Sequence, residues 1–111
     1  MTSSPVSATS TFQAVTTDET ATLRVHGPLC KAVARQVRNA LVDLLQGRPK
    51  RLVVDLSDAT DLDTLGMGAL LAGSLWARHK GVHFAILPSP IISAALTAAK
   101  LDRYLTLVES A

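Results

Sequence analysis

The stretch Arg51–Lys80 constrains the fold more than any other part of this sequence. It opens with a short apolar run, Leu52–Val54, which is typical of a buried strand and which Asp55 closes. After a polar turn, Asp63–Thr64 stands directly before a long, almost uncharged helical pattern that ends at Gly81. The stretch therefore predicts the order strand, loop, helix, with a carboxylate and a hydroxyl at the N-terminus of the helix.

The residues before this helix suit two uses. We expect Asp58, Thr60 and Asp61 to lie in the polar turn that leads to it. Aspartate and threonine are favoured at a helix N-terminus because their side-chain oxygens accept hydrogen bonds from backbone N–H groups without an intrahelical partner. The same N–H groups and the helix dipole also favour an added phosphate. The segment therefore suits both a structural cap and a phosphorylation switch.

The size and charge of the chain limit its function. Its 111 residues, 48% of them hydrophobic, are enough for the core of one domain but not for a catalytic domain with a second module. A formal net charge of +2 is too small to predict a nucleic-acid partner, and we expect the basic run Arg48–Arg51 to be a solvated turn. The lone Cys30 excludes a disulfide framework and fits a reducing compartment, where we expect it to be a small buried residue.

The N-terminal segment Met1–Ser10 is rich in serine and threonine, so we expect it to be flexible and to precede a single domain over residues 11–111. It lacks the basic and apolar regions of a secretory signal, and no segment has the unbroken apolar length of a membrane helix. We therefore expect a soluble, cytoplasmic protein without membrane insertion.

The rest of the chain alternates strands and helices. Thr11–Val15 and Thr20–His26 alternate apolar and polar residues, which predicts a β-hairpin that Gly27–Pro28 ends. Leu29–Leu45 has helical spacing, and Gly47 closes that helix. The elements predicted after Gly81 are a strand at Val82–Leu87, a turn at Pro88–Pro90, a helix at Ile91–Ala99 and a strand at Leu105–Val108. This order predicts an α/β domain whose mixed β-sheet of four to five strands has helices packed against it.

Two groups of side chains outside the central stretch could bind a partner or a metal. Lys31, Arg35 and Arg38 lie on one face of the first helix, which is either a solvated face or a stripe that docks an acidic partner. His83 lies in an apolar run, where a histidine is more often structural than a ligand. No second ligand stands at a suitable spacing from it, so no metal site is predicted.

The helix that begins at Thr64 has two apolar stripes. One, which we expect to face the sheet, contains Met67, Leu70, Leu71 and Leu75. The other contains Leu65, Ala69, Ala72 and Trp76, of which Leu65, Ala69 and Trp76 are expected to help form a docking surface. Gly66 and Gly68 allow either close approach by the backbone of a partner or packing against a neighbouring strand.

The run Asp55–Leu71, DLSDATDLDTLGMGALL, resembles the signature of STAS domains, the fold of bacterial anti-sigma-factor antagonists. In that family a strand ends in an Asp-Leu-Ser-like turn, and Asp-Ser-Ser/Thr-Gly-Leu-Gly follows at the start of a helix. Asp63–Gly68 occupies that place here. Val25–Leu29, Gly81–Leu87 and Leu101–Leu105 are similar to three further segments of the family. The ordered set, which covers Thr20–Ser110, makes the resemblance specific.

The resemblance implies a function in transcription regulation and the stress response. An unphosphorylated antagonist binds an anti-sigma factor, commonly a serine/threonine protein kinase, and frees a sigma factor. Phosphorylation of the first hydroxyl residue after the motif aspartate, here Thr64, separates the complex, and a phosphatase resets it. The partner-binding residues expected in this chain are Asp61, Asp63, Thr64, Leu65, Gly66, Met67, Gly68 and Trp76. The family implies no catalytic residue, cofactor or metal, and a homodimer stays open.

Two alternatives stay open. Leu65 stands where the family usually has serine or threonine, and Cys30 where an acidic residue is common, so the chain can instead be a non-phosphorylated STAS scaffold or an accessory subunit of a transporter. The second alternative is an enzyme that binds magnesium at Asp55, Asp61 and Asp63. It is less favoured, because phosphohydrolases place Asp-x-Asp directly at the end of a strand and no general base pair is evident.

Overall fold

A computed structural model of the protein describes residues 11–17 and 19–109, without the side chains of residues 11, 12, 31 and 32. The segment Met1–Ser10, which we expect to be flexible, lies outside the described residues, as does Asp18 of the predicted hairpin turn. None of the helices in the described ranges is long and apolar enough to cross a membrane.

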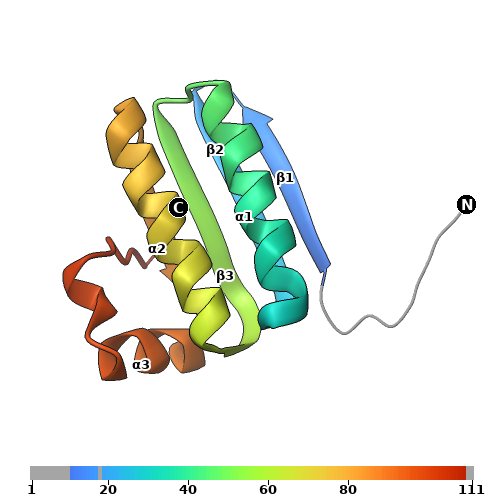
Figure 1. Ribbon diagram of the computed structural model, residues 1–111, viewed down its shortest axis with the longest axis vertical. Coiled ribbons are helices and arrows are strands. Elements are labelled where there is room, and N and C mark those ends of the chain that lie inside the picture. Colours follow the sequence, from blue (N-terminus) through green and yellow to red (C-terminus); the bar gives the residue numbers. More distant parts are fainter. Residues whose placement is uncertain (1–10, 18, 110–111) are drawn as a thin grey trace, which may run out of the picture.

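Four strands form one mixed sheet in the order β1-β2-β3-β4 (Figure 1). They are β1 (Thr11–Thr17), β2 (Thr20–Leu29), β3 (Arg51–Leu62) and β4 (His83–Pro88). β1 and β2 pair antiparallel, whereas β2–β3 and β3–β4 pair parallel. The predicted hairpin and the predicted mixed α/β sheet are therefore confirmed.

Two helices cover one face of the sheet. α1 (Lys31–Gln46) and α2 (Thr64–Lys80) lie side by side in front of the strands in Figure 1, and both begin at the same end of the molecule. Crossovers between parallel strands nearly always take one hand, so the two helices that connect β2, β3 and β4 in order cover the same face. α3 (Pro90–Ala98) lies at the end of the sheet near the start of α2. The core fills the space between these helices and the sheet.

α2 packs through small residues as well as large ones. Leu70, Gly73 and Ala77 are buried, whereas Leu75, which we predicted to face the sheet, is 60% exposed. A Cβ atom on Gly73 would lie 2.7 Å from Leu41 Cδ1, so the glycine lets α2 approach α1 closely. The prediction for Leu75 is wrong because large residues alone were taken to define the inner face.

β2 does not end at Gly27–Pro28, as we predicted, but continues to Leu29. The register with β3 shifts between Gly27 and Pro28, and Gly27 has φ 83°, a backbone conformation that favours glycine. β1 pairs only as far as His26, so Pro28 lies where β2 has one paired edge and can do without a backbone N–H.

β3 is much longer than the predicted strand. It has 12 residues and includes Asp58, Thr60 and Asp61, which we predicted to form a polar turn. Along β3, pairing with β4 stops at Leu56, whereas pairing with β2 continues to Leu62. Polar side chains are tolerated there because this part of β3 is a narrow ribbon, paired on one edge.

The C-terminal segment does not form the predicted strand at Leu105–Val108. Leu107 makes a single parallel bridge to Ile86, whose N–H donates to the Thr106 carbonyl oxygen at 2.8 Å. A 3₁₀ helix, η1, at Leu101–Arg103 precedes it. The described sheet therefore has four strands, the lower number of the predicted range.

Candidate functional site

The start of α2 places a hydroxyl at the surface. Asp63 is the N-cap, and its Oδ1 accepts a hydrogen bond from the Gly66 N–H at 2.8 Å. Thr64 is the first residue of the helix, and its side chain is exposed. The predicted carboxylate cap is therefore confirmed, and Thr64 is open to an enzyme that would modify it.

The end of β3 adds a second carboxylate. Asp61 is exposed, and its Oδ1 accepts a hydrogen bond from the Leu62 N–H at 2.8 Å. Cys30, the N-cap of α1, is half-buried rather than buried as expected. Its burial, and then the negative charges of Asp63 and Asp61, raise the pKa of the Cys30 thiol, so the thiol is protonated near neutral pH.

The two glycines of the motif have different surroundings. Gly66 is buried, and a Cβ atom there would overlap the Leu29 carbonyl oxygen and lie 2.9 Å from Leu62 Cδ1. It therefore serves packing and is not exposed to a partner. Gly68 is exposed, and a Cβ atom there would meet nothing within 4 Å, so close approach by a partner stays open at this position.

A groove of about 330 Å³ runs between α1 and α2 beside Thr64. Its lining residues come from the first turns of both helices and are Ala34, Arg35, Arg38, Thr64, Leu65, Gly68 and Ala69. Arg35 and Arg38 are exposed, and Ala69 is buried. The basic stripe and the hydroxyl lie far apart in the sequence, and only the packing of α1 on α2 brings them together.

The other predicted docking residues do not form one compact patch. Leu65 is 56% exposed next to Thr64, but Met67 is half-buried and packs against the core. Trp76 is 36% exposed on the last part of α2, where it lines a hollow with residues such as Val42 of α1. We call Asp61, Asp63, Thr64, Leu65 and Gly68 the Thr64 end.

The aspartates of the magnesium alternative are not brought together. Asp55 is buried, with Oδ2 3.2 Å from Arg24 Nε and Oδ1 accepting hydrogen bonds from the Ser57 N–H and hydroxyl at 3.0 and 2.6 Å. Burial alone would raise the pKa of Asp55, but the bonds from Ser57 and the charge of Arg24 outweigh it and lower that pKa. Within residues 11–17 and 19–109, no three His, Cys, Asp or Glu side chains group as metal ligands.

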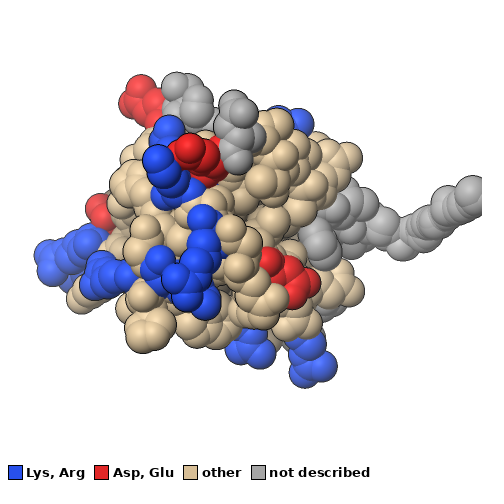
Figure 2. Space-filling view, turned by 90° about the horizontal axis from the view of Figure 1, so that it is seen from above, with Lys and Arg blue, Asp and Glu red and all other residues tan. Residues whose placement is uncertain are grey.

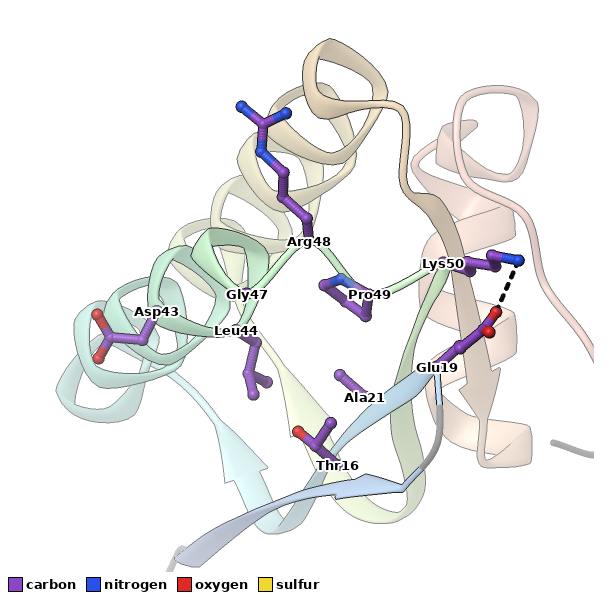
Figure 3. Close-up of a pocket in the computed structure, with 9 residues that line it drawn as sticks. All are labelled: Thr16, Glu19, Ala21, Asp43, Leu44, Gly47, Arg48, Pro49 and Lys50. Atoms are coloured by element: carbon purple, nitrogen blue, oxygen red, sulfur yellow. Dashed lines mark ion pairs between the residues drawn. The ribbon is translucent and has the colours of Figure 1, made fainter.

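A hollow of about 350 Å³ lies at the opposite end of the molecule, between the β1–β2 turn, the end of α1 and the start of β3 (Figure 3). Figure 3 shows Asp43 and Arg48 pointing away from it, while Lys50 is paired with Glu19 at 2.8 Å. Leu44 points inward. Because polar groups do not converge in this hollow, it is not a candidate catalytic or ligand site.

Lysine and arginine side chains gather on this same end, where α1 and α2 finish (Figure 2). We call it the basic end, and its residues are Arg48, Lys50, Arg51, Arg78 and Lys80. Two of them stand in the last turn of α2, where positive charge is favourable beside the negative pole of the helix dipole. The basic end therefore has a structural explanation within the fold.

Several solved structures share the fold of this chain. An anti-sigma factor antagonist from Mycobacterium paratuberculosis has a TM-score of 0.78 and 20% identity, covering 91% of this chain and 86% of that chain. Phosphorylated SpoIIAA from Bacillus has a TM-score of 0.70 and 20% identity, covering 90% and 93%, and SpoIIAA also matches in its unphosphorylated form. A sulfate transporter family protein from Wolinella succinogenes has a TM-score of 0.72 and 21% identity, covering 82% and 75%.

Identities of this size show likeness of fold alone. Among curated proteins, no sequence matches this chain significantly. The family model described as "Mlab, STAS domain" matches residues 12–109. The chain therefore belongs to the STAS domain family, and its fold is that of the anti-sigma factor antagonists.

Proposed function

We propose that this protein is an anti-sigma-factor antagonist that is switched off by phosphorylation of Thr64. In its unphosphorylated form it binds an anti-sigma factor, often a serine/threonine kinase, and so frees a sigma factor for transcription. The observation that supports this most is the exposed Thr64 hydroxyl at the first position of α2, directly after the N-cap Asp63. A cytoplasmic location and a phosphatase that resets the switch follow from the same proposal.

The partner-binding surface centres on the Thr64 end and extends along α2. Leu65 and Trp76 are exposed apolar residues on the same side of this helix, about 16 Å apart along its axis. A partner that lies along α2 would contact both of these side chains. Asp61 and Gly68 would lie at its edge, where a partner can approach the backbone.

Phosphorylation would change this surface without unfolding the domain. A phosphate on Thr64 adds about −1.5 to −2 charges next to Asp61 and Asp63. The free N–H groups and the dipole at the start of α2 tolerate that charge in water. A partner that closed over it would have to desolvate it, which is costly for a charged group. Binding is therefore lost while the fold is kept.

A pull-down from a lysate of the source cells tests the switch. The immobilised baits are wild type, Thr64→Ala, Thr64→Glu and the control Thr16→Glu, an exposed threonine at the other end of the sheet. We expect wild type, Thr64→Ala and Thr16→Glu to capture an anti-sigma factor, identified by mass spectrometry, and Thr64→Glu to capture at least about tenfold less, since one buried negative charge costs several kcal/mol. Equal capture by all four baits would exclude the switch.

A second experiment uses the kinase itself. When the captured regulator is a kinase, addition of ATP should release wild type but not Thr64→Ala, because only wild type can receive the phosphoryl group on Thr64 Oγ1. Mass spectrometry of the released protein should locate the phosphate at Thr64. Release of both proteins by ATP would show that another residue, or nucleotide binding alone, controls the complex.

The alternative is a STAS scaffold or an accessory subunit of a transporter. Leu65 replaces the serine or threonine that the family usually has next to the phosphoacceptor, and a sulfate transporter family protein shares the fold. This alternative predicts that candidate kinases with ATP leave Thr64 unmodified and that Thr64→Glu retains its partner. A homodimer in solution, measured by light scattering, is compatible with either function.

A further inference from the structure

Two arginines of α1 line the same groove between α1 and α2 as the phosphoacceptor position. Arg35 and Arg38 are three residues apart, so they are neighbours on the helix surface. Both are exposed and both line the groove that Thr64 also lines. Neither has a carboxylate partner among the described residues, where the arginine and lysine ion pairs are Arg24–Asp55 and Lys50–Glu19.

We propose that Arg35 and Arg38 bind the phosphate of phosphorylated Thr64 within the same chain, so that the groove is a phosphomonoester site. The inference rests on the proposed phosphorylation of Thr64. A guanidinium group offers paired N–H donors that match two phosphate oxygens, and charge-assisted bonds of this kind are strong. The groove of about 330 Å³ leaves room for the group between the helices.

The surroundings make this site necessary. Asp61 and Asp63 repel a phosphate on Thr64, whereas the free N–H groups at the start of α2 attract it. Cys30 is uncharged because burial and these aspartates raise its pKa. Among the residues whose side chains the structure describes, Arg35 and Arg38 are the cations that line the groove and can offset the added charge. The phosphate, held by both arginines, would then lie beside Leu65 and Gly68 in the groove, so a partner that binds these two residues would meet its bulk as well as its charge.

The test uses protein in which phosphothreonine is incorporated at residue 64 during translation. Neither a kinase nor a partner protein is then needed. ³¹P NMR follows the second ionisation of the phosphate in wild type, in Arg35→Gln/Arg38→Gln and in the control Arg48→Gln/Arg78→Gln, which removes equal charge at the basic end. We expect the phosphate pKa of wild type and control to lie about one unit below that of Arg35→Gln/Arg38→Gln, because nearby cations favour the dianion. Equal values in wild type and Arg35→Gln/Arg38→Gln would overturn the proposal.

A conservative variant separates pairing from folding defects. Arg35→Lys/Arg38→Lys retains both charges but loses the paired donors, so its phosphate pKa should fall between those of wild type and Arg35→Gln/Arg38→Gln. Thermal unfolding followed by circular dichroism checks that each variant is folded. A phosphate pKa for the lysine variant above that of the glutamine variant would contradict a role for charge in the groove.

The same variants distinguish this site from the proposed function. Unphosphorylated Arg35→Gln/Arg38→Gln should still capture the anti-sigma factor, and loss of capture would assign the arginines to the partner instead and overturn the phosphate site. If the phosphate pKa differs between wild type and Arg35→Gln/Arg38→Gln but unphosphorylated wild type captures no anti-sigma factor, the phosphate site would be supported and the proposed function excluded. If Thr64→Glu fails to capture the anti-sigma factor but the phosphate pKa is the same in wild type and Arg35→Gln/Arg38→Gln, the proposed function would be supported and the phosphate site excluded.

Discussion

The two ends of this small domain carry hollows of similar volume, about 330 Å³ beside Thr64 and about 350 Å³ at the basic end, but they differ in chemistry. Beside Thr64, its hydroxyl and two arginines that have no ion-pair partner among the described residues line one groove. In the hollow at the basic end, Asp43 and Arg48 point away from the space, and Lys50 pairs with Glu19. Convergence of groups, and not the size of a hollow, therefore marks the candidate site.

Helix direction explains part of this difference. α1 and α2 both begin at the Thr64 end and both finish at the basic end (Figure 1). The positive poles of two helix dipoles therefore meet near Thr64, where an added anion is favoured. The negative poles lie at the other end, where Arg78 and Lys80 offset them. An anion switch fits one end of this fold and not the other.

The largest effect on stability is expected at Gly66, the buried glycine between Leu65 and Gly68 of the Thr64 end. Gly66→Ala should lower the free energy of unfolding by about 2 kcal/mol, because the new methyl group overlaps the backbone of β2 and forces the helix to move. Gly68→Ala should leave it unchanged or raise it by up to about 1 kcal/mol, since alanine favours the helix and meets no neighbour. Urea unfolding measures both, and equal effects would remove the distinction between the two glycines.

The next largest effect on the free energy of unfolding is expected at Asp55, which lies in β3 between the two ends. Its pKa is lowered in the folded state, so its contribution to stability is present above the unfolded pKa of about 4 and is lost as pH falls through the lower folded value. Asp55→Asn should cost about 1.5 kcal/mol at pH 7 through weaker bonds to Arg24 and Ser57. The difference from wild type should shrink below pH 4 in urea unfolding measured across pH.

A smaller effect is expected from the helix cap. Asp63→Ala should cost about 1 kcal/mol, because the Gly66 N–H loses its acceptor. Asp63→Asn retains a side-chain oxygen at the N-cap and should recover most of this loss. The measurement is again urea unfolding at pH 7, and an unchanged stability in Asp63→Ala would show that the cap is not needed to start α2.

The smallest effect is expected at the basic end. Glu19→Gln breaks the Lys50–Glu19 pair, whose side chains are 77% and 62% exposed, so the change in stability should be no more than about 0.5 kcal/mol and should vanish at high salt. The same variant should capture the anti-sigma factor as wild type does. A loss of capture would show that the basic end contributes to the partner surface and would weaken the contrast drawn between the ends.

The outcome for individual residues shows where sequence reasoning works. Asp63 as N-cap and Gly47 and Gly81 at helix C-termini were all predicted, because caps depend on neighbouring residues in the chain. The last helix was predicted to begin at Ile91, one residue after its observed start at Pro90. The lengths of β2 and β3 were not predicted, because a strand extends as far as another strand pairs with it. The outward position of Leu75 was also missed, since glycines and alanines define the buried side of α2.

The sequence by itself determined the order of the elements from β1 to α3, the α/β class and the hydroxyl after an aspartate at the start of α2, because these follow from local hydrogen bonding and hydrophobic periodicity. Only the tertiary structure decided that Gly66 is for packing, that Gly68 is open and that Arg35 and Arg38 share a groove with Thr64. These facts depend on how closely α1, α2 and the sheet approach one another. That distance is set by the fit of side chains from distant parts of the chain.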